Sequence, residues 1–283
     1  MRDNYTFQLL APFHSQFSQS FTRSKYDLHV YDQHLASMQR LRGRIYLKDC
    51  AIRPWDVDDD GRYKMQHDEQ SWHLLLLDGN KEVIGCARYL VHTGDVRYEQ
   101  LRIAHSPLAR DENWGFKVRE AVQSDLLNVR RKGLAYVEAG GWALAEEWRG
   151  TRAALEILVG SYALGQLWGG CLGSCTATVR HSSSSIIRRI GGTSFQSRGV
   201  VLPPYQDSEY GCTMELLRFD YRSPSERFIP LINQLRTKLA KSTVLFGAQR
   251  DEMVPEFLPE ALNFLHVTAG GFSRPAIRLL PSQ

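Results

Sequence analysis

The stretch from Tyr136 to Gly191 limits the folds open to this chain more than any other part of it. Apolar residues favour a strand over 134–145, helical spacing follows over 151–167, and a second apolar run favours a strand over 171–179. A short helix over 182–190 then ends at a glycine. Strands that alternate with helices in this way predict an α/β protein in which helices cover a mixed sheet.

The turn between the first of these strands and its helix is basic. It reads Trp148-Arg-Gly-Thr-Arg152 and opens the helix directly. The first N–H groups of a helix lack backbone partners and attract an anion. Because two arginines add positive charge there, we expect Arg149, Gly150, Thr151 and Arg152 to bind a phosphate-bearing ligand.

The remaining pattern extends the same architecture on both sides. Before this stretch we expect a helix over 30–48, a β-hairpin with strands over 72–78 and 83–92, an extended piece over 98–103 and a helix over 112–132. After it we expect strands over 200–203 and 212–219 and a helix over 224–240, introduced by Ser223-Pro224.

The two ends of the chain lack a clear period. Residues 1–29 predict an N-terminal arm, and the prolines and glycines that follow residue 240 predict an irregular tail. The expected organisation is therefore an arm over 1–29, a central domain over 30–222, and a C-terminal helix and tail over 223–283.

Composition is that of an ordinary globular protein. With 35 basic and 31 acidic residues, the net charge of +4 gives a weak preference for anionic partners and does not suggest nucleic acid. No apolar run approaches the ~20 residues that span a bilayer, and the first five residues, Met1 to Tyr5, lack the apolar core of a signal peptide. We expect a cytoplasmic protein, with membrane contact only at its periphery through a lipid product.

The five cysteines are odd in number and scattered, which favours reduced, buried thiols. Cys171-x3-Cys175, with His181 nearby, has an alternative interpretation as one corner of a metal site. No second pair with zinc spacing follows it. We therefore expect no metal and no tightly bound cofactor.

Three stretches carry a family resemblance. These are Val137–Leu155, with its strand and phosphate-binding turn, Ser182–Gly191 followed by Thr193-Ser-Phe195, and Val83–Leu90 in the hairpin. In this order of elements the chain resembles the GNAT superfamily of acyltransferases over roughly residues 30–220. The resemblance implies a GNAT-like mixed central sheet flanked by helices, and an N-acyltransferase activity.

Within that superfamily the chain is most similar to the N-acyl amino acid synthases and the acyl-homoserine-lactone (autoinducer) synthases. Arg42-x-x-x-Tyr46 is similar to their Arg-x-x-x-Phe, Arg88 to their hairpin arginine, and Glu138 to their strand glutamate. The resemblance implies that Arg42 and Tyr46 bind substrate. It implies a catalytic role for Arg88 and Glu138.

The departures from the family pattern are informative. Lactone synthases carry Glu-x-x-Arg-Phe where this chain has Glu138-Ala-Gly-Gly141-Trp142, so the arginine is missing. Acetyl-CoA members carry Gln/Arg-x-x-Gly-x-Gly/Ala, whereas Glu147-Trp-Arg-Gly150-Thr-Arg152 keeps only the middle glycine. These differences favour an acyl group delivered on the phosphopantetheine of an acyl carrier protein, with acyl-CoA as the other donor.

Acyl transfer from a thioester to an amine needs positioning, a site for the oxyanion and a proton acceptor. Backbone N–H groups of Trp142, Ala143 and Leu144 are expected to hold the donor if the strand breaks at Gly140-Gly141. Glu138 is the expected base.

Each of these assignments has a structural alternative. Glu138 could simply pair with Arg88, and Arg42 could lie on a solvated helix face. The serines at 182–185 are read as a helix cap, because no Gly-x-Ser-x-Gly surrounds them.

The favoured function is transfer of a long acyl chain to a small amine such as an amino acid. Synthesis of an acyl-homoserine lactone and acyl-ligand binding without turnover remain alternatives. Arg130, Arg131 and Lys132, with Arg149 and Arg152, suit an acidic carrier protein, or form a solvated basic face.

Overall fold

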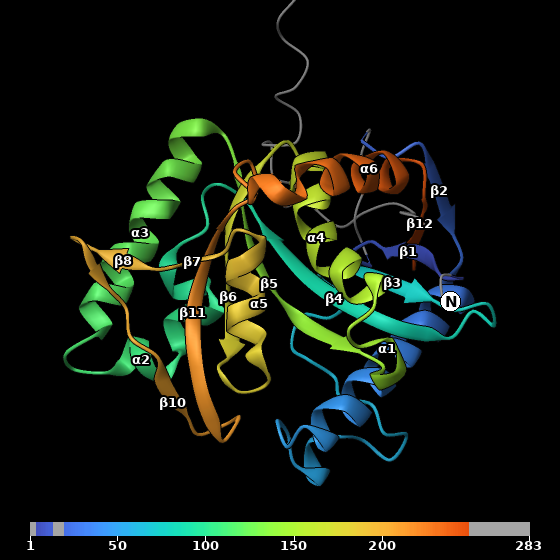
Figure 1. Cartoon of the computed structure of the whole chain (residues 1–283), viewed down its shortest axis with the longest axis horizontal. Helices are drawn as coiled ribbons and strands as arrows, with labels where there is room; N and C mark the ends of the chain where they lie inside the picture. Colours follow the sequence, from blue (N-terminus) through green and yellow to red (C-terminus); the bar gives the residue numbers. More distant parts are fainter. Residues whose placement is uncertain (1–3, 14–19, 249–283) are drawn as a thin grey trace, which may run out of the picture.

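A computed structural model describes residues 4–13 and 20–248, and one large mixed sheet organises them (Figure 1). In this part of the chain the sheet comprises β1 (Thr6–Leu10), β2 (Arg23–Tyr26), β3 (Trp72–Leu77), β4 (Val83–His92), β5 (Ala135–Leu144), β6 (Cys171–Thr178), β7 (Thr193–Ser194), β10 (Tyr205–Asp207), β11 (Cys212–Asp220) and β12 (Thr243–Phe246). A separate small hairpin pairs β8 (Gln196–Ser197) with β9 (Val200–Val201).

The helices of the same region are α1 (Leu28–Lys48), α2 (Pro107–Arg110), α3 (Gly115–Lys132), α4 (Arg152–Leu167), α5 (Ser183–Ile190) and α6 (Ile229–Ala240). Short 3₁₀ helices are η1 (Pro54–Asp56), η2 (Tyr98–Gln100), η3 (Arg102–His105), η4 (Glu146–Trp148), η5 (Arg180–Ser182) and η6 (Glu226–Phe228). Asp27 caps α1 by accepting from the N–H of Val30. Gly133 ends α3 in the left-handed conformation.

The strand order is β10–β11–β6–β5–β4–β3–β1–β12–β2, with β7 paired beside β11. Most neighbours are antiparallel, but β5 and β6 are parallel because α4 carries the chain from one to the other. Strand β12 is parallel to both β1 and β2.

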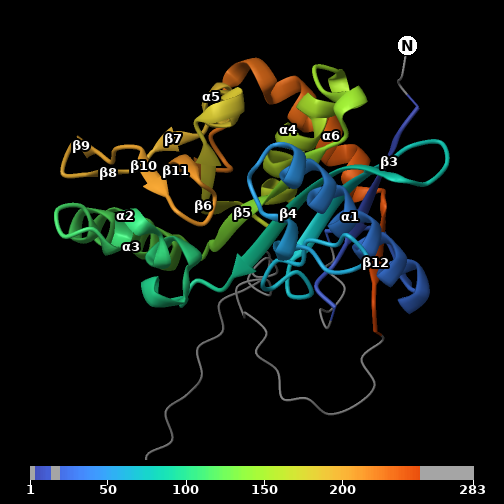
Figure 2. The same ribbon diagram turned by 90° about the horizontal axis from the view of Figure 1, so that it is seen from below.

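Helices cover both faces of the sheet. Figure 2 shows α4, α5 and α6 on one side and α2 and α3 on the other. Gly160 lets α4 approach β3, since an added Cβ there would lie 2.7 Å from Cδ2 of Leu74. Helix α1 packs on β4 and β5 from the face opposite α4 (Figure 1). The α/β architecture predicted from the sequence is confirmed.

Several local predictions are wrong. The extended piece expected over 98–103 forms the 3₁₀ helices η2 and η3 instead. The helix expected from Pro224 begins at Ile229, after η6, so Ser223 does not cap it. The cap predicted for the serines of α5 is absent too, because Ser182 makes no side-chain hydrogen bond there.

Two segments expected to be irregular contribute strands. Strand β1 lies inside the sheet between β3 and β12, and β12 itself comes from the expected tail. The sheet therefore crosses the boundaries predicted at 29/30 and 222/223. The rest of the predicted tail, over 249–283, lies outside the described residues. Within the described part, no helix has the length and apolar character needed to cross a membrane.

Candidate active site

Strands β5 and β6 separate and leave a cavity between them. They pair only from Ala135 with Cys171 to Glu138 with Ser174, although β5 continues to Leu144 and β6 to Thr178. A cavity of about 450 Å³ lies there, lined by both strands and by α1, α4 and α5. Its size is in the range of small-molecule sites.

The strand that borders this cavity is broken by a β-bulge. Between two register pairs, β4 has the single residue Ala87 where β5 has Gly141 and Trp142. Gly141 adopts φ +61°, which glycine tolerates best. The break expected at Gly140-Gly141 is therefore present.

The bulge sets the direction of the backbone that follows it. Ala145 donates its N–H to the carbonyl oxygen of Ile84 on β4 at 2.8 Å. Because successive N–H groups in a strand alternate in direction, the N–H of Leu144 turns away from β4, toward the side of β6. Trp142, Ala143 and Leu144, all expected to hold a donor, line the cavity.

Glu138 lies in the cavity wall and is almost fully buried, at 8% exposure. Its Oε1 accepts the backbone N–H of Arg102 at 2.7 Å, and its Oε2 lies 3.0 Å from Nε2 of His92. The expected alternative, a pair with Arg88, is not what the structure shows. His92, which comes from the end of β4, was not predicted as a partner of Glu138.

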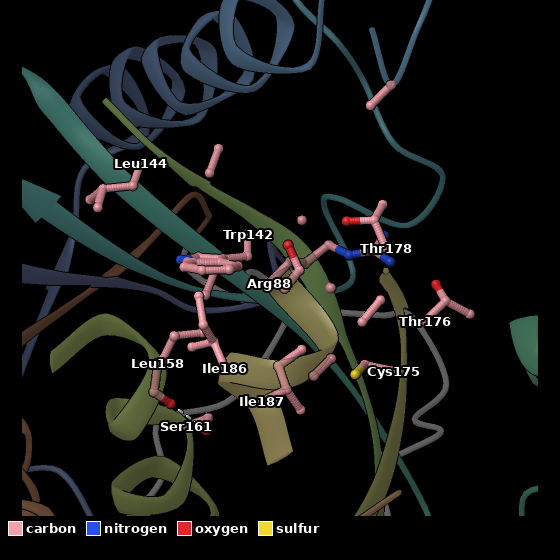
Figure 3. Close-up of a pocket in the computed structure, with 18 of the residues that line it drawn as sticks. Arg88, Trp142, Leu144, Leu158, Ser161, Cys175, Thr176, Thr178, Ile186 and Ile187 are labelled. Carbon is pink, nitrogen blue, oxygen red and sulfur yellow. Dashed lines mark hydrogen bonds between the residues drawn. The ribbon is translucent and has the colours of Figure 1, made fainter. Parts of the chain in front are cut away.

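Arg88 is a buried cation that faces the cavity, at 4% exposure. Its Nη1 donates to the carbonyl oxygen of Gln66 at 2.6 Å, and its Nε has no partner among the described residues. Burial lowers the pKa of Arg88, because it disfavours the charged form. Figure 3 shows the side chain extending toward Thr178. An anionic group of a ligand could accept the hydrogen bonds that the Arg88 guanidinium does not make to the described residues.

Arg42 does not lie on a solvated face and does not line the cavity. It is fully buried, and its Nη1 donates to Asp68 at 3.0 Å. Burial disfavours its charge, but the Asp68 carboxylate raises the pKa of Arg42 overall. An added Cβ at Gly141 would lie 3.1 Å from Nη1 of Arg42, so this guanidinium packs beneath the bulge.

Tyr46, one turn further along α1, does line the cavity. Its hydroxyl donates to the carbonyl oxygen of Trp142 at 3.0 Å. Of the two residues expected to bind substrate, the structure brings only Tyr46 to the cavity, and it ties α1 to the bulge.

Only some residues of the basic turn before α4 line the cavity. Arg149 and Gly150 line the cavity, and Thr151, the N-cap of α4, makes no side-chain cap hydrogen bond within the described part of the chain. Thr151 instead donates its hydroxyl to the carbonyl oxygen of Trp148 at 2.6 Å. Arg152 bonds to Glu156 on its own helix at 2.6 Å. Thr151 and Arg152 are therefore not part of the cavity wall.

The far wall of the cavity is apolar and was not predicted. Figure 3 shows Trp142 beside Leu158 and Ile186, with Ile187 and Cys175 further along. The apolar spacing within 183–190 is the signal that could have indicated this wall. Such a surface suits a hydrocarbon chain.

Cys175 is a thiol in that wall. Burial raises its pKa to about 12, so it stays protonated at neutral pH and is not a reactive nucleophile. Cys171 is buried as well. In the described part of the chain no His, Cys, Asp or Glu side chains gather into a group that could hold a metal ion.

The basic residues expected to meet a carrier protein fall into two groups. Arg130, Arg131 and Lys132 end α3, just before β5 begins, whereas Arg149 follows the far end of β5. Ten strand residues at ~3.3 Å each place the groups about 30 Å apart. Of the residues expected to meet the carrier, Arg149 lines the cavity, and Arg152 beside it does not.

Comparison with known proteins bears on the fold. No family model and no curated protein matches the chain. Among solved structures, the CoA-dependent acyl-homoserine lactone synthase BjaI, with SAM and isopentyl-CoA, aligns with a TM-score of 0.51 at 13% identity and covers 92% of this chain and 98% of its own. The CoA-dependent acyl-homoserine lactone synthase MesI aligns at 0.50 and 15% identity, over 82% of this chain and 95% of its own. The protein therefore has the GNAT-like fold of the acyl-homoserine lactone synthases.

Proposed function

We propose that the protein is an N-acyltransferase that moves an acyl group from a thioester to the amine of a small acceptor. The observation that carries this proposal is the cavity between β5 and β6, where a bulged strand, a buried carboxylate and a buried arginine meet. BjaI, which shares the fold, was solved with isopentyl-CoA and SAM. A thioester donor and an amine acceptor are consistent with that pairing.

The donor would lie along the unpaired edge of β5. The N–H of Leu144 points away from β4 and would hold the pantetheine arm. The thioester would then lie further back along β5, at the bulge and nearer to Glu138. The hydrocarbon chain would then contact the wall formed by Ile186 and Ile187. Holding both reactants in this geometry supplies roughly 7–11 kcal/mol of the barrier.

The acceptor amine would attack the thioester carbon from the side of Glu138. A new C–N bond forms and the C–S bond breaks. The amine proton passes to Glu138, which returns it to the departing thiolate, so that a thiol leaves. General-base catalysis of this kind contributes about 10²–10⁴-fold. The bonds to His92 and to the N–H of Arg102 hold the Glu138 carboxylate in one orientation.

The acceptor in this proposal carries a carboxylate, as an amino acid does. Arg88 is a buried guanidinium that no carboxylate of the described residues pairs, and its Nε is left without a partner. A planar carboxylate matches a guanidinium in two hydrogen bonds.

The donor is an acyl group on pantetheine, held either on acyl carrier protein or on coenzyme A. Arg44, Lys48 and Arg149 are exposed near the cavity and would meet an acidic carrier. The apolar wall favours a long chain.

The test is thiol release by the purified protein. Acyl-CoA and a carrier protein that bears an acyl thioester are offered separately, with and without a pool of amino acids. The products are identified by mass spectrometry. We expect release that depends on the amine, and an N-acyl amino acid as product. Glu138→Gln should lower the rate about 10²-fold or more at unchanged thermal stability.

Two outcomes would contradict the proposal. An acyl-homoserine lactone as product would assign the lactone synthase reaction, which the glycine at position 141 argues against. No release above background with any donor would favour an acyl-binding protein without turnover.

A further inference from the structure

Two arginines from different elements converge on one corner of the cavity. Nη2 of Arg149, which follows β5, lies 3.0 Å from the Asp49 carboxylate. Nη2 of Arg180, which follows β6, donates to the carbonyl oxygen of Cys50 at 2.7 Å. Because Asp49 and Cys50 are consecutive residues, both guanidinium groups meet at the end of α1. Asp49, Arg149 and Arg180 all line the cavity.

Arg180 is incompletely satisfied at this corner. Among the described residues, its Nη2 reaches, besides Cys50, only the carbonyl oxygen of Tyr210, at 3.4 Å. Its Nε is buried and has no partner among residues 4–13 and 20–248. A guanidinium offers five N–H donors and fits oxyanions in a fork geometry, so the described carbonyl partners leave most of that capacity unused.

Arg149 stabilises the negative charge of Asp49 at the end of α1. Asp49 is the C-cap of α1, where the helix dipole disfavours a negative charge. Arg149 offsets this by pairing with the carboxylate. The pair is partly open to solvent, with 43% of the Arg149 side chain and 24% of the Asp49 side chain exposed. Pairs of this kind are weak and readily exchanged for a better anion.

We propose that Arg149 and Arg180 form a clamp for the phosphate of the pantetheine donor, and that Asp49 and the Cys50 carbonyl occupy the clamp while no donor is bound. This inference rests on the function proposed above. A phosphate offers three oxygens and more charge than one carboxylate, so it bonds both arginines together. The donor phosphate displaces Asp49, and the corner at the end of α1 moves aside.

The uncapped first turn of α4 supports the same location. Gly150 and Ala154 line the cavity next to Arg149, and among the described residues Thr151, the N-cap of α4, makes no side-chain cap hydrogen bond. A phosphate between the two arginines would therefore also meet a helix N-terminus. The shared chemistry is the pantetheine phosphate, which both coenzyme A and a carrier protein present.

Binding by titration calorimetry tests the clamp directly. The probes are free coenzyme A, a carrier protein with its phosphopantetheine arm, and pantetheine without phosphate. We expect Arg180→Gln to weaken binding of a phosphate-bearing probe by about tenfold. Asp49→Asn removes the competitor and should tighten the same binding about threefold. Neither change should alter the affinity for pantetheine.

Matched variants control for charge alone. Arg198→Gln removes an exposed arginine that pairs with Glu120 on α3, and Asp60→Asn removes a carboxylate that pairs with Arg62. Both should bind the probes like the wild type. The gain from Asp49→Asn can come only from a folded protein, so it also guards against loss through unfolding.

Either of two results overturns the clamp: Arg180→Gln binds the phosphate probes as tightly as the wild type, or Asp49→Asn binds them no more tightly. A response to coenzyme A alone, or to the carrier protein alone, supports the clamp and identifies the source of the phosphate. Turnover is scored separately. A protein that binds the phosphate probes through the clamp but transfers no acyl group would contradict the proposed function and still support the clamp.

Discussion

Tyr46 on α1 donates its hydroxyl hydrogen to the carbonyl oxygen of Trp142, 3.0 Å away on the bulge of β5. This bond joins the helix on one face of the sheet to the strand that borders the cavity. It fixes the peptide that follows Trp142, and thereby the direction of the N–H groups that a donor would meet.

Tyr46→Phe should therefore reduce turnover more than it reduces stability. The change leaves the Trp142 carbonyl without this partner, at a cost of about 1–3 kcal/mol. We expect kcat to fall about tenfold with a modest loss in the free energy of unfolding, measured by thiol release and urea titration. Tyr26→Phe, at an exposed edge strand, is the control. An unchanged kcat would show that the bond does not position the donor.

Gly141→Ala should damage both stability and activity. Gly141 has φ +61°, and an added Cβ would lie 3.1 Å from Cβ of Arg88 and from Nη1 of Arg42. Gly211→Ala is the matched control, since it has φ +56° with nothing within 4 Å of the added Cβ. Gly211→Ala should lower the free energy of unfolding by about 1–2 kcal/mol, because of the left-handed backbone alone. Gly141→Ala should lower the free energy of unfolding by more than this and should abolish acyl transfer. An equal loss of stability in the two variants, with activity retained, would contradict the role given to the bulge.

Arg88→Gln should raise the KM for the acceptor without changing the KM for the donor. The loss of hydrogen bonds between charged groups corresponds to about 10- to 100-fold. Steady-state kinetics with each substrate varied in turn measure the two constants. A change confined to the donor would place Arg88 at the thioester and not at the acceptor carboxylate.

His73 should make the stability of the fold fall as the pH is lowered. It is fully buried, and burial lowers its pKa to about 4 from an ordinary value of 6.5. Between these two values the unfolded chain binds the proton and the folded chain does not, so the free energy of unfolding decreases as the pH falls from about 6.5 to 4. The linked loss is about 3 kcal/mol.

Urea unfolding at several pH values checks this dependence. His73→Asn should show a shallower decrease over that window, whereas the exposed His105→Asn should keep the slope of the wild type. An identical slope in His73→Asn would mean that another group carries the effect.

The sequence predicts the central part of the fold because its signals there are local. Alternation and helical spacing locate β5, α4 and β6, and a Gly-Gly pair locates the bulge. Glu138 and Arg88 were identified through the resemblance, by their similarity to the strand glutamate and the hairpin arginine of the synthases. These predictions needed no knowledge of distant contacts.

Contacts between distant segments account for what was missed. Leu9 pairs with Val244 across almost the whole chain, and neither short strand has a pattern of its own. Arg42 is spaced like a surface residue, and its burial is explained by partners in a loop without a period, the Asp68 carboxylate and the carbonyl oxygen of Tyr63. Arg180 lies outside every motif and reaches the cavity because β6 ends beside the end of α1.

The structure of the protein crystallised with an acyl-pantetheine donor tests the central claim most directly, by locating the thioester. We predict electron density for the pantetheine arm along β5 from Leu144 back toward Ala139, with the thioester at the bulge beside Glu138 and the chain against Ile186 and Ile187. A donor bound anywhere other than between β5 and β6 would contradict the assignment of this cavity as the site of acyl transfer.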